Sequence, residues 1–181
     1  MRPLALAALG RDRPGIVAAV TGVLVAHHVN VEDSRMAILR GEFAMVLVLA
    51  GPAELELAGL DDDLGRVREE LGLEALSLTE LSDQVESPGA SAATHIVSVY
   101  GADHPGIVHA VAAAVSEHGV NITDLTTRLV DAPQAEPLYA MALELAVAGE
   151  DEAAVLEGAL AEVGRAQGVE VSFRALERDA L

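Results

Sequence analysis

The chain contains one sequence motif twice. Residues 10–31 read GRDRPGIVAAVTGVLVAHHVNV and residues 101–122 read GADHPGIVHAVAAAVSEHGVNI, so the two segments align at an offset of 91 without a gap. Of the 22 aligned positions, 11 are identical. A further match, FAM at residues 43–45 with YAM at residues 139–141, lies at an offset of 96, so the second copy holds five extra residues, which we place in Asp131–Pro137. A duplication of this length predicts two small domains with the same fold.

The pattern of apolar residues predicts the same order of secondary structure in each copy. Apolar and β-branched runs alternate with segments in which apolar residues recur at helical spacing. Arg40-Gly41-Glu42 is typical of a hairpin turn, and Pro14 suits the first position of a helix. The resulting order, β-α-β-β-α-β, predicts an α+β class made of two ferredoxin-like domains, each an antiparallel sheet with both helices on one face. In the first copy the expected elements are, in order, residues 4–9, 14–27, 29–40, 43–50, 61–71 and 73–81.

The domain boundaries follow from composition. We expect one domain at residues 1–83 and a second at 94–181, joined by a linker at 84–93 that contains Ser-Pro-Gly-Ala-Ser. The strands predicted to be central are apolar at nearly every position, whereas a sheet with one wet face should alternate. We therefore expect the face away from the helices to be covered by the other domain or by a second subunit. The alternative is that an alanine-rich composition merely blurs the alternation.

Charge and composition exclude several classes of function. The chain has 181 residues with 29 acidic and 11 basic side chains, a formal net charge of −18. Such a charge repels a nucleic-acid backbone, so we expect no direct nucleic-acid binding. Without cysteine there is no disulfide, thiol nucleophile or thiolate metal site, and the six histidines show no ligand-like spacing, so we expect no metal and no cofactor. No signal peptide or membrane span is visible, which favours a cytoplasmic protein with no membrane partner.

The repeated motif resembles the ACT domain, a small ligand-binding module of amino-acid metabolism. That family carries D/N-x-P-G after its first strand and G-x-N-I before its second. Here the matching segments are Asp12-Arg-Pro-Gly15 with Val29-Asn30-Val31, and Asp103-His-Pro-Gly106 with Gly119-Val-Asn121-Ile122. The tandem layout is similar to that of two-ACT repressors of the glycine cleavage genes. The resemblance implies a regulator that binds a small amino acid and acts on a partner without a DNA-binding domain of its own.

The residues of the motif suit recognition of a free amino acid. The turn before the first helix exposes unpaired backbone N–H groups that favour a carboxylate. A neighbouring aspartate offers its charge to an ammonium group, and an asparagine offers both a donor and an acceptor. Arginine in the same turn is a second candidate for the carboxylate. The predicted ligand-binding residues are Gly10, Asp12, Arg13, Pro14, Gly15 and Asn30 in the first copy and Asp103, His104, Gly106 and Asn121 in the second.

Each of these residues has a structural alternative. Asp12 and Asp103 are also well placed to cap the helix that follows. Asn30 and Asn121 could serve only as turn residues that bond their own backbone. The glycines of the two turns could serve only close packing of helix on strand.

We expect a non-enzymatic, amino-acid-sensing regulator whose ligand is glycine or a similar amino acid. Its protein partner would be a transcription factor or an enzyme, and its assembly a homodimer. Two alternatives remain: a dissociable regulatory subunit of an amino-acid enzyme, and a dimerisation module without a ligand.

Overall fold

The computed structural model describes residues 1–82, 92–130 and 138–176. The chain forms two compact units, Met1–Val85 and Glu86–Leu181. The extra residues placed in Asp131–Pro137 and most of the expected linker at 84–93 lie outside the described residues, so the linker bounds stay a prediction. Among the described residues, no helix has the length and apolar character needed to cross a membrane.

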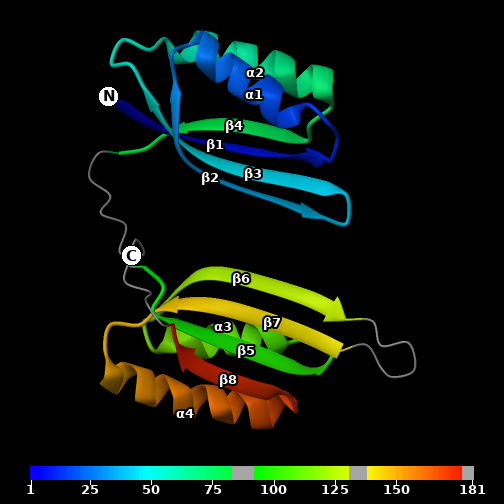
Figure 1. Ribbon diagram of the computed structural model, residues 1–181, viewed down its shortest axis with the longest axis vertical. Helices are drawn as coiled ribbons and strands as arrows, with labels where there is room; N and C mark the ends of the chain where they lie inside the picture. Colours follow the sequence, from blue (N-terminus) through cyan, green and yellow to red (C-terminus); the bar gives the residue numbers. More distant parts are fainter. Residues whose placement is uncertain (83–91, 131–137, 177–181) are drawn as a thin grey trace. The chain divides into compact units, whose positions relative to one another are not determined.

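Both units have the predicted order of elements (Figure 1). The first consists of β1 (Arg2–Arg11), α1 (Ile16–Ala26), β2 (Asn30–Leu39), β3 (Glu42–Gly51), α2 (Leu57–Leu71) and β4 (Ala75–Glu80). The second consists of β5 (His95–Ala102), α3 (Ile107–Glu117), β6 (Asn121–Val130), β7 (Leu138–Ala146), α4 (Glu150–Gln167) and β8 (Glu170–Ala175).

Each unit contains one four-stranded antiparallel sheet. The strand order is β2-β3-β1-β4 in the first unit and β6-β7-β5-β8 in the second. The first and third strands of each unit are therefore central, as predicted, and the second and fourth are edges. The β2–β3 hairpin turns through Arg40 and Gly41, whose φ angles of 53° and 87° are those of a tight hairpin turn. The α+β, ferredoxin-like prediction is confirmed.

The core of each unit lies between the sheet and its two helices. In the first unit, alternate residues of β1 (Leu4, Leu6 and Ala8) are buried against an apolar stripe of α1. That stripe is formed by Ile16, Val20 and Leu24, which recur at helical spacing. The second unit has its own separate core cluster. Each repeat thus buries its own apolar residues.

Two helix starts differ from the predictions. Helix α1 begins at Ile16, two residues after Pro14, because Gly15 takes a left-handed backbone conformation and occupies the N-cap position. Helix α2 begins at Leu57 and not at Asp61, after an N-cap glutamate whose side chain makes no capping hydrogen bond. The first turn of α2 therefore carries no acidic residue, and the acidic residues lie further along the helix.

On the face of the first sheet away from the helices, the two central strands present apolar residues: Ala5, Ala7 and Leu9 of β1 pair with Val48, Val46 and Ala44 of β3. The edge strands add Asp33, Arg35, Ser77 and Thr79 to this face. Val46 is 52% exposed and Leu9 is 43% exposed. Coverage of this face by another domain or subunit remains a prediction.

Candidate functional site

The turn that leads into the first helix has the same shape in both repeats. Gly15 and Gly106 are the N-cap residues of α1 and α3, with φ angles of 101° and 107°. Residues other than glycine rarely adopt this backbone conformation, so the turn requires glycine. No atom lies within 4 Å of the Cβ position of Gly15, and near Gly106 only the Gln167 side chain comes as close as 3.8 Å. The glycines therefore provide a backbone conformation with open space above it, and the packing alternative does not account for them.

The aspartates of the turn do not cap the helix. The N-cap position belongs to Gly15 and Gly106, which have no side chain to offer. The side chains of Asp12 and Asp103 are exposed, and neither accepts a hydrogen bond from the described part of the chain. The backbone N–H of Asp12 donates to the carbonyl of Gly41, 2.8 Å away, which fixes the turn against the β2–β3 hairpin. The capping alternative is thus wrong, and both carboxylates are available to a ligand.

Arg13 and His104 occupy the same place in their repeats and make the same long-range contact. Arg13 donates from a guanidinium nitrogen to the carbonyl of Leu71, the last residue of α2, at 2.9 Å. His104 Nε2 donates to the carbonyl of Gln167, the last residue of α4, at 2.8 Å. Sequence reasoning placed both side chains on the ligand. Their hydrogen bonds go instead to the end of the second helix, where carbonyls lack intrahelical partners.

The electrostatics of His104 follow from its contacts. Its Nδ1 faces the carbonyl of Pro105 at 3.2 Å, so both ring nitrogens point at carbonyl oxygens. The carbonyl of Gln167 above all, and then that of Pro105, raise the pKa of His104, while partial burial lowers it. The carboxylate of Asp103 raises it further.

Gly10 and Gly101 are required by packing. A Cβ at Gly10 would lie 3.1 Å from Cα of Leu73, and one at Gly101 would lie 3.2 Å from Cα of Val169. These partners lie between the second helix and the last strand of each unit. The space that glycine leaves is filled by the protein, so a ligand role for Gly10 would involve its backbone alone.

The structure separates the asparagines from the turns. Asn30 pairs with Ala50, which pairs with Pro3 at the start of β1, whereas Asp12 follows the end of that strand. Nine residues of extended chain between Pro3 and Asp12 correspond to about 30 Å. Helix α1 runs antiparallel to β1 along the sheet, so the residues before the helix and the residues after it lie at opposite ends of the sheet. Asn121 lies at the corresponding end of the second sheet, opposite Ala146. Within one domain, the Asp12 turn and Asn30 therefore lie at opposite ends of the sheet.

A β-bulge follows each asparagine. The register between β2 and β3 shifts between Val31 and Asp33, and that between β6 and β7 shifts between Ile122 and Asp124. Asp33 accepts a hydrogen bond from the backbone N–H of Ser34 at 2.7 Å. Sequence reasoning did not identify this feature, although its signal is visible in the repeated spacing of Asn30 to Asp33 and Asn121 to Asp124. Bulges re-aim neighbouring side chains and are frequent beside functional sites.

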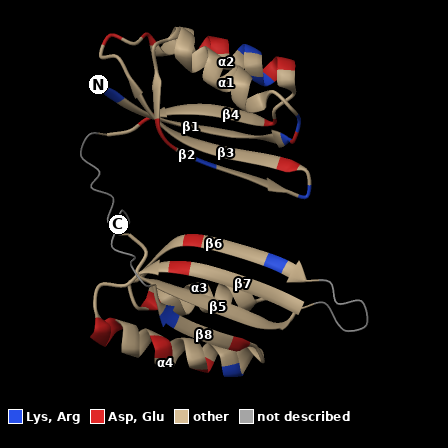
Figure 2. Cartoon of the chain, in the orientation of Figure 1, with Lys and Arg blue, Asp and Glu red and all other residues tan. Residues whose placement is uncertain are grey.

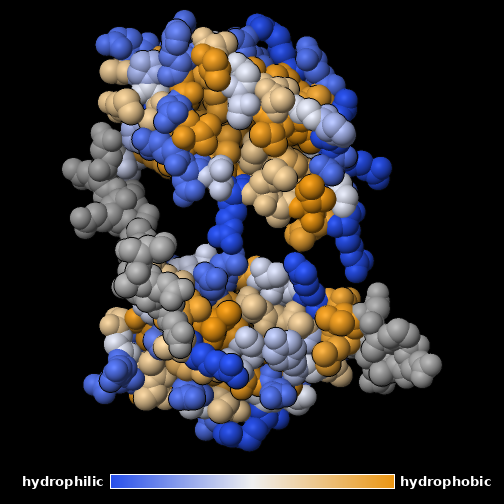
Figure 3. All heavy atoms as spheres, in the orientation of Figure 1, coloured by the Kyte–Doolittle hydropathy of each residue, from blue (hydrophilic) through white to orange (hydrophobic). Residues whose placement is uncertain are grey.

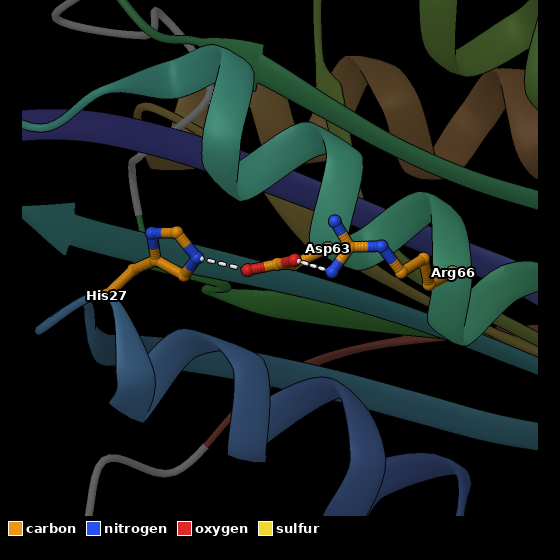
Figure 4. Close-up of polar contacts among 3 residues, drawn as sticks. All are labelled: His27, Asp63 and Arg66. Atoms are coloured by element: carbon orange, nitrogen blue, oxygen red, sulfur yellow. Dashed lines mark hydrogen bonds and ion pairs between the residues drawn. The ribbon is translucent and has the colours of Figure 1, made fainter.

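Sequence reasoning also missed three interacting polar side chains on the first two helices, His27, Asp63 and Arg66 (Figure 4). His27, the C-cap residue of α1, bonds through Nε2 to Asp63 of α2 at 2.8 Å, and Arg66 bonds to the other carboxylate oxygen. The hydrogen bond from His27 is the main reason that the pKa of Asp63 is lowered. In the second repeat, His118 caps α3 and its Nδ1 faces the carbonyl of Ala114, within its own helix, at 2.7 Å.

Two open cavities lie elsewhere in the first unit. One, of about 470 Å³, is lined by residues of α2 and β4, namely Leu57, Ala58, Asp61, Leu78, Thr79 and Glu80. The other, of about 480 Å³, lies along β2 and β3 and is lined by Asp33, Ser34, Arg35, Met36, Val46 and Val48. Neither contains a predicted ligand-binding residue. Within the ranges that the structure describes, no cluster of three histidine or acidic residues is arranged to hold a metal ion.

Comparison with known proteins identifies both repeats. Residues 2–76 and residues 95–157 each match an ACT domain model. The chain is 32% identical over 133 residues to the glycine cleavage system transcriptional repressor of Escherichia coli, a match that covers 69% of this chain and 64% of the repressor.

Two further relatives match along nearly the whole chain. The phosphoserine phosphatase of Streptomyces coelicolor is 32% identical over 171 residues, which is 90% of this chain but 37% of the phosphatase. The crystal structure of an unknown protein from Galdieria sulphuraria superposes with a TM-score of 0.77 at 29% identity, covering 97% of this chain and 99% of that one. The tandem arrangement therefore recurs in a solved structure of the same extent.

Proposed function

The chain belongs to the ACT domain family, and from this premise we propose that it senses a small amino acid, glycine or a similar one, and conveys that signal to a protein partner. It is an ACT-domain regulatory protein related to the glycine cleavage system transcriptional repressor. We propose that it controls the transcription of glycine cleavage or other amino-acid genes through that partner.

The duplicated turn is the observation that carries this proposal. Each copy combines a glycine with open space above it, the free N–H groups at the start of a helix, and a carboxylate without a hydrogen bond among the described residues. The N–H groups favour the ligand carboxylate, and Asp12 or Asp103 favours the ligand ammonium. A small amino acid suits a turn that Gly15 or Gly106 leaves unobstructed.

We propose that a second copy of the chain completes the site. Strand β2 is an edge of its sheet, so its outer backbone groups are available for pairing. Antiparallel pairing of β2 with the same strand of a second copy sets the start of one strand beside the end of the other. Asn30 then approaches the β2–β3 hairpin of the second copy, against which Asp12 of the partner subunit is held. The two halves of the motif, separated within one domain, meet across this interface.

The surface beside β2 supports such a contact. Helix α1 contains no charged residue, in a chain of net charge −18 (Figure 2). On α1, the side chain of Val17 is 43% exposed and that of Val25 is 71% exposed. On β2, Met36 and Ile38 are about half exposed. Figure 3 shows apolar surface on the visible face of the first unit. Helix α1 therefore adds no like-charge repulsion to a contact made by β2, whose own charged residues are Glu32, Asp33 and Arg35.

Thermal unfolding with a panel of amino acids tests the proposed function. A ligand that binds only the folded protein stabilises it by about 2.7 kcal/mol at 100 times its dissociation constant. We expect a shift that is selective for glycine or a similar amino acid, and sedimentation should show a dimer. Asn30→Ala should weaken the shift as Asp12→Ala does. If no amino acid shifts the transition at millimolar concentration, the sensor proposal fails and the dimerisation module takes its place.

One observation favours a second candidate function. The match to a phosphoserine phosphatase spans 90% of this chain and leaves most of the enzyme outside the match. Tandem ACT domains of this kind can therefore be part of an amino-acid enzyme, and the second candidate is a dissociable regulatory subunit of one. Purification of the chain with its bound proteins separates the two candidates, because a transcription factor supports the first and an enzyme the second.

A further inference from the structure

The face of the second sheet that is turned away from α3 and α4 carries charged residues on both edge strands. On β6 these are Asp124 and Arg128, and on β8 they are Glu170 and Arg174. The register across the sheet sets Arg128 level with Glu170, and Asp124 level with Arg174. These charges therefore mark the corners of the face and alternate in sign around it. Figure 2 shows one red and one blue segment on β6 and, in the opposite order, on β8.

The charged side chains of the corners point away from the core. The alternate residues of the sheet face the other way, since Val97 of β5 is fully buried and Val171 of β8 packs against the core. Arg128, Glu170 and Arg174 are exposed, and within the described ranges none of these three forms an ion pair. Their charges are therefore available to a partner.

The middle of this face is small and largely uncharged. It includes Ala140 and Ala142 of β7 and Ser98 of β5, which let another sheet approach closely. Beside Ala140 lies Tyr100, whose side chain is 46% exposed. Aromatic residues are enriched at the centres of protein interfaces, and charged residues at their rims. The composition of the face thus fits a contact with another protein surface.

The first sheet lacks this arrangement of charges. Its residues at the corresponding register positions are Asp33, Ala37, Ala75 and Thr79, of which one is charged. The alternating pattern therefore belongs to the second repeat, and the first sheet offers no matching set of charges.

A face with this pattern is complementary to itself. A two-fold rotation about an axis parallel to the strands lays β6 of one copy over β8 of the other, so each arginine meets an acidic residue. A two-fold rotation about the axis that crosses the strands exchanges the two ends of each strand, with the same result. In both arrangements an arginine of the second copy lies over Asp124 and beside Glu144, which pairs directly with Asp124. The arginine offsets the repulsion within that like-charged pair.

We propose that the outer face of the second sheet binds the same face of a second copy of the chain, with Tyr100 and the small residues at the centre and ion pairs at the corners. In a chain of net charge −18, opposite charges at the corners allow two copies to attract each other at this face. The contact goes beyond the proposed function, whose interface uses β2 of the first unit. A chain that makes both two-fold contacts forms assemblies larger than a dimer.

Charge reversal at two corners of the full-length chain tests the contact. We expect sedimentation equilibrium to show association of the native chain beyond the dimer as its concentration rises into the high micromolar range. Arg128→Glu and Glu170→Arg should each weaken this step by about tenfold, because like charges then meet at symmetry-related corners. The double variant identifies the axis: it restores association if the axis runs along the strands and weakens association further if the axis crosses them.

Ala75→Arg is the matched control, because it places an arginine at the corresponding corner of the first sheet. We expect this variant to associate as the native chain does. The inference is overturned if Arg128→Glu and Glu170→Arg also associate as the native chain does. If the native chain passes only from monomer to dimer and Arg128→Glu abolishes that step, the sheet contact stands and the β2 contact of the proposed function fails.

Discussion

The two repeats hold their paired helices by different means. In the first, α1 is joined to α2 at both ends, through Arg13 at the N-terminal turn and through His27 and Asp63 at the other end. In the second, His104 joins the turn to α4, but His118 bonds within its own helix. Aligning the buried Leu60 with Leu156 sets Asp63 opposite Ala159, which cannot form an ion pair. Duplication thus preserved the shape of the turn and changed the contacts that hold the helices.

The difference lies in the side chains that make these contacts. In the first repeat the turn is joined to α2 by Arg13, a permanent cation, and the far end of α1 is joined to α2 by the His27–Asp63 pair. In the second repeat the turn is joined to α4 by His104, a titratable side chain.

The largest difference between the repeats is expected from alanine at the packed glycines. A Cβ at Gly101 would lie 2.6 Å from Cγ1 of Val169, a stiff β-branched side chain, whereas one at Gly10 would first meet the flexible Cδ2 of Leu73 at 3.0 Å. We expect Gly101→Ala to cost about 2 kcal/mol of unfolding free energy and Gly10→Ala about 1 kcal/mol. Urea unfolding of the two variants measures both costs. Equal costs would show that Val169 yields as readily as Leu73.

The second expected difference is in how the stability of each unit depends on pH, and this dependence has opposite signs in the two units. The pKa of Asp63 is lowered by His27, so its contribution to the first unit is present above its ordinary value of 3.8 and is lost as pH falls through the lowered value. The contribution of His104 to the second unit is lost as pH rises. We expect acid to weaken the first unit and mild base the second, as followed by hydrogen exchange in each unit. Asp63→Asn should remove the acid effect only.

A smaller effect, equal in both repeats, is expected at the aspartates of the turns. Because neither caps a helix, Asp12→Ala and Asp103→Ala should each change the unfolding free energy by less than about 0.5 kcal/mol. Loss of a true cap costs about 1 kcal/mol. Ligand-induced stabilisation should nevertheless decrease in both variants. Thermal unfolding with and without glycine separates these results, and a loss of apo stability alone would assign the aspartates a structural role.

We expect the isolated protein not to bind DNA. The net charge of −18 opposes the approach of phosphates, and the basic residues are scattered along both repeats. Gel retardation with promoter DNA at physiological salt should show no shift for the native chain, and none for Arg13→His. Sequence-selective retardation would overturn the proposal that a partner supplies the contact with DNA.

Much of the fold was predictable because the repeat and its hydrophobic periodicity depend on local sequence. The strand order followed from the β-α-β-β-α-β succession and the right-handed crossover. The start of α1 was missed because Gly15 acts through its backbone angle, and the start of α2 was missed because Glu56 makes no capping hydrogen bond. Such starts have no side-chain signal.

The hydrogen-bond partners of the predicted site residues could not be inferred from the sequence. Arg13 and His104 bond to carbonyls 58 and 63 residues away, and any residue type supplies a carbonyl, so no sequence pattern marks these partners. The spacing of 18 residues between Asp12 and Asn30 suggested one site, yet that spacing contains the whole of α1 and therefore spans the length of the sheet. A residue count becomes a distance only after the direction of each element is known.

The separate cores have a consequence for biosynthesis. The first unit is closed when β4 pairs with β1, and its core uses no residue from the second half of the chain. A ribosome adds about 5 to 20 residues per second, so the 96 residues Glu86–Leu181 emerge over roughly 5 to 20 s. Two neighbouring segments with 11 of 22 residues identical are prone to exchange strands if both are unfolded together. If the first unit folds early, its strands are already paired before the corresponding strands of the second unit have been synthesised, so the two sets cannot exchange.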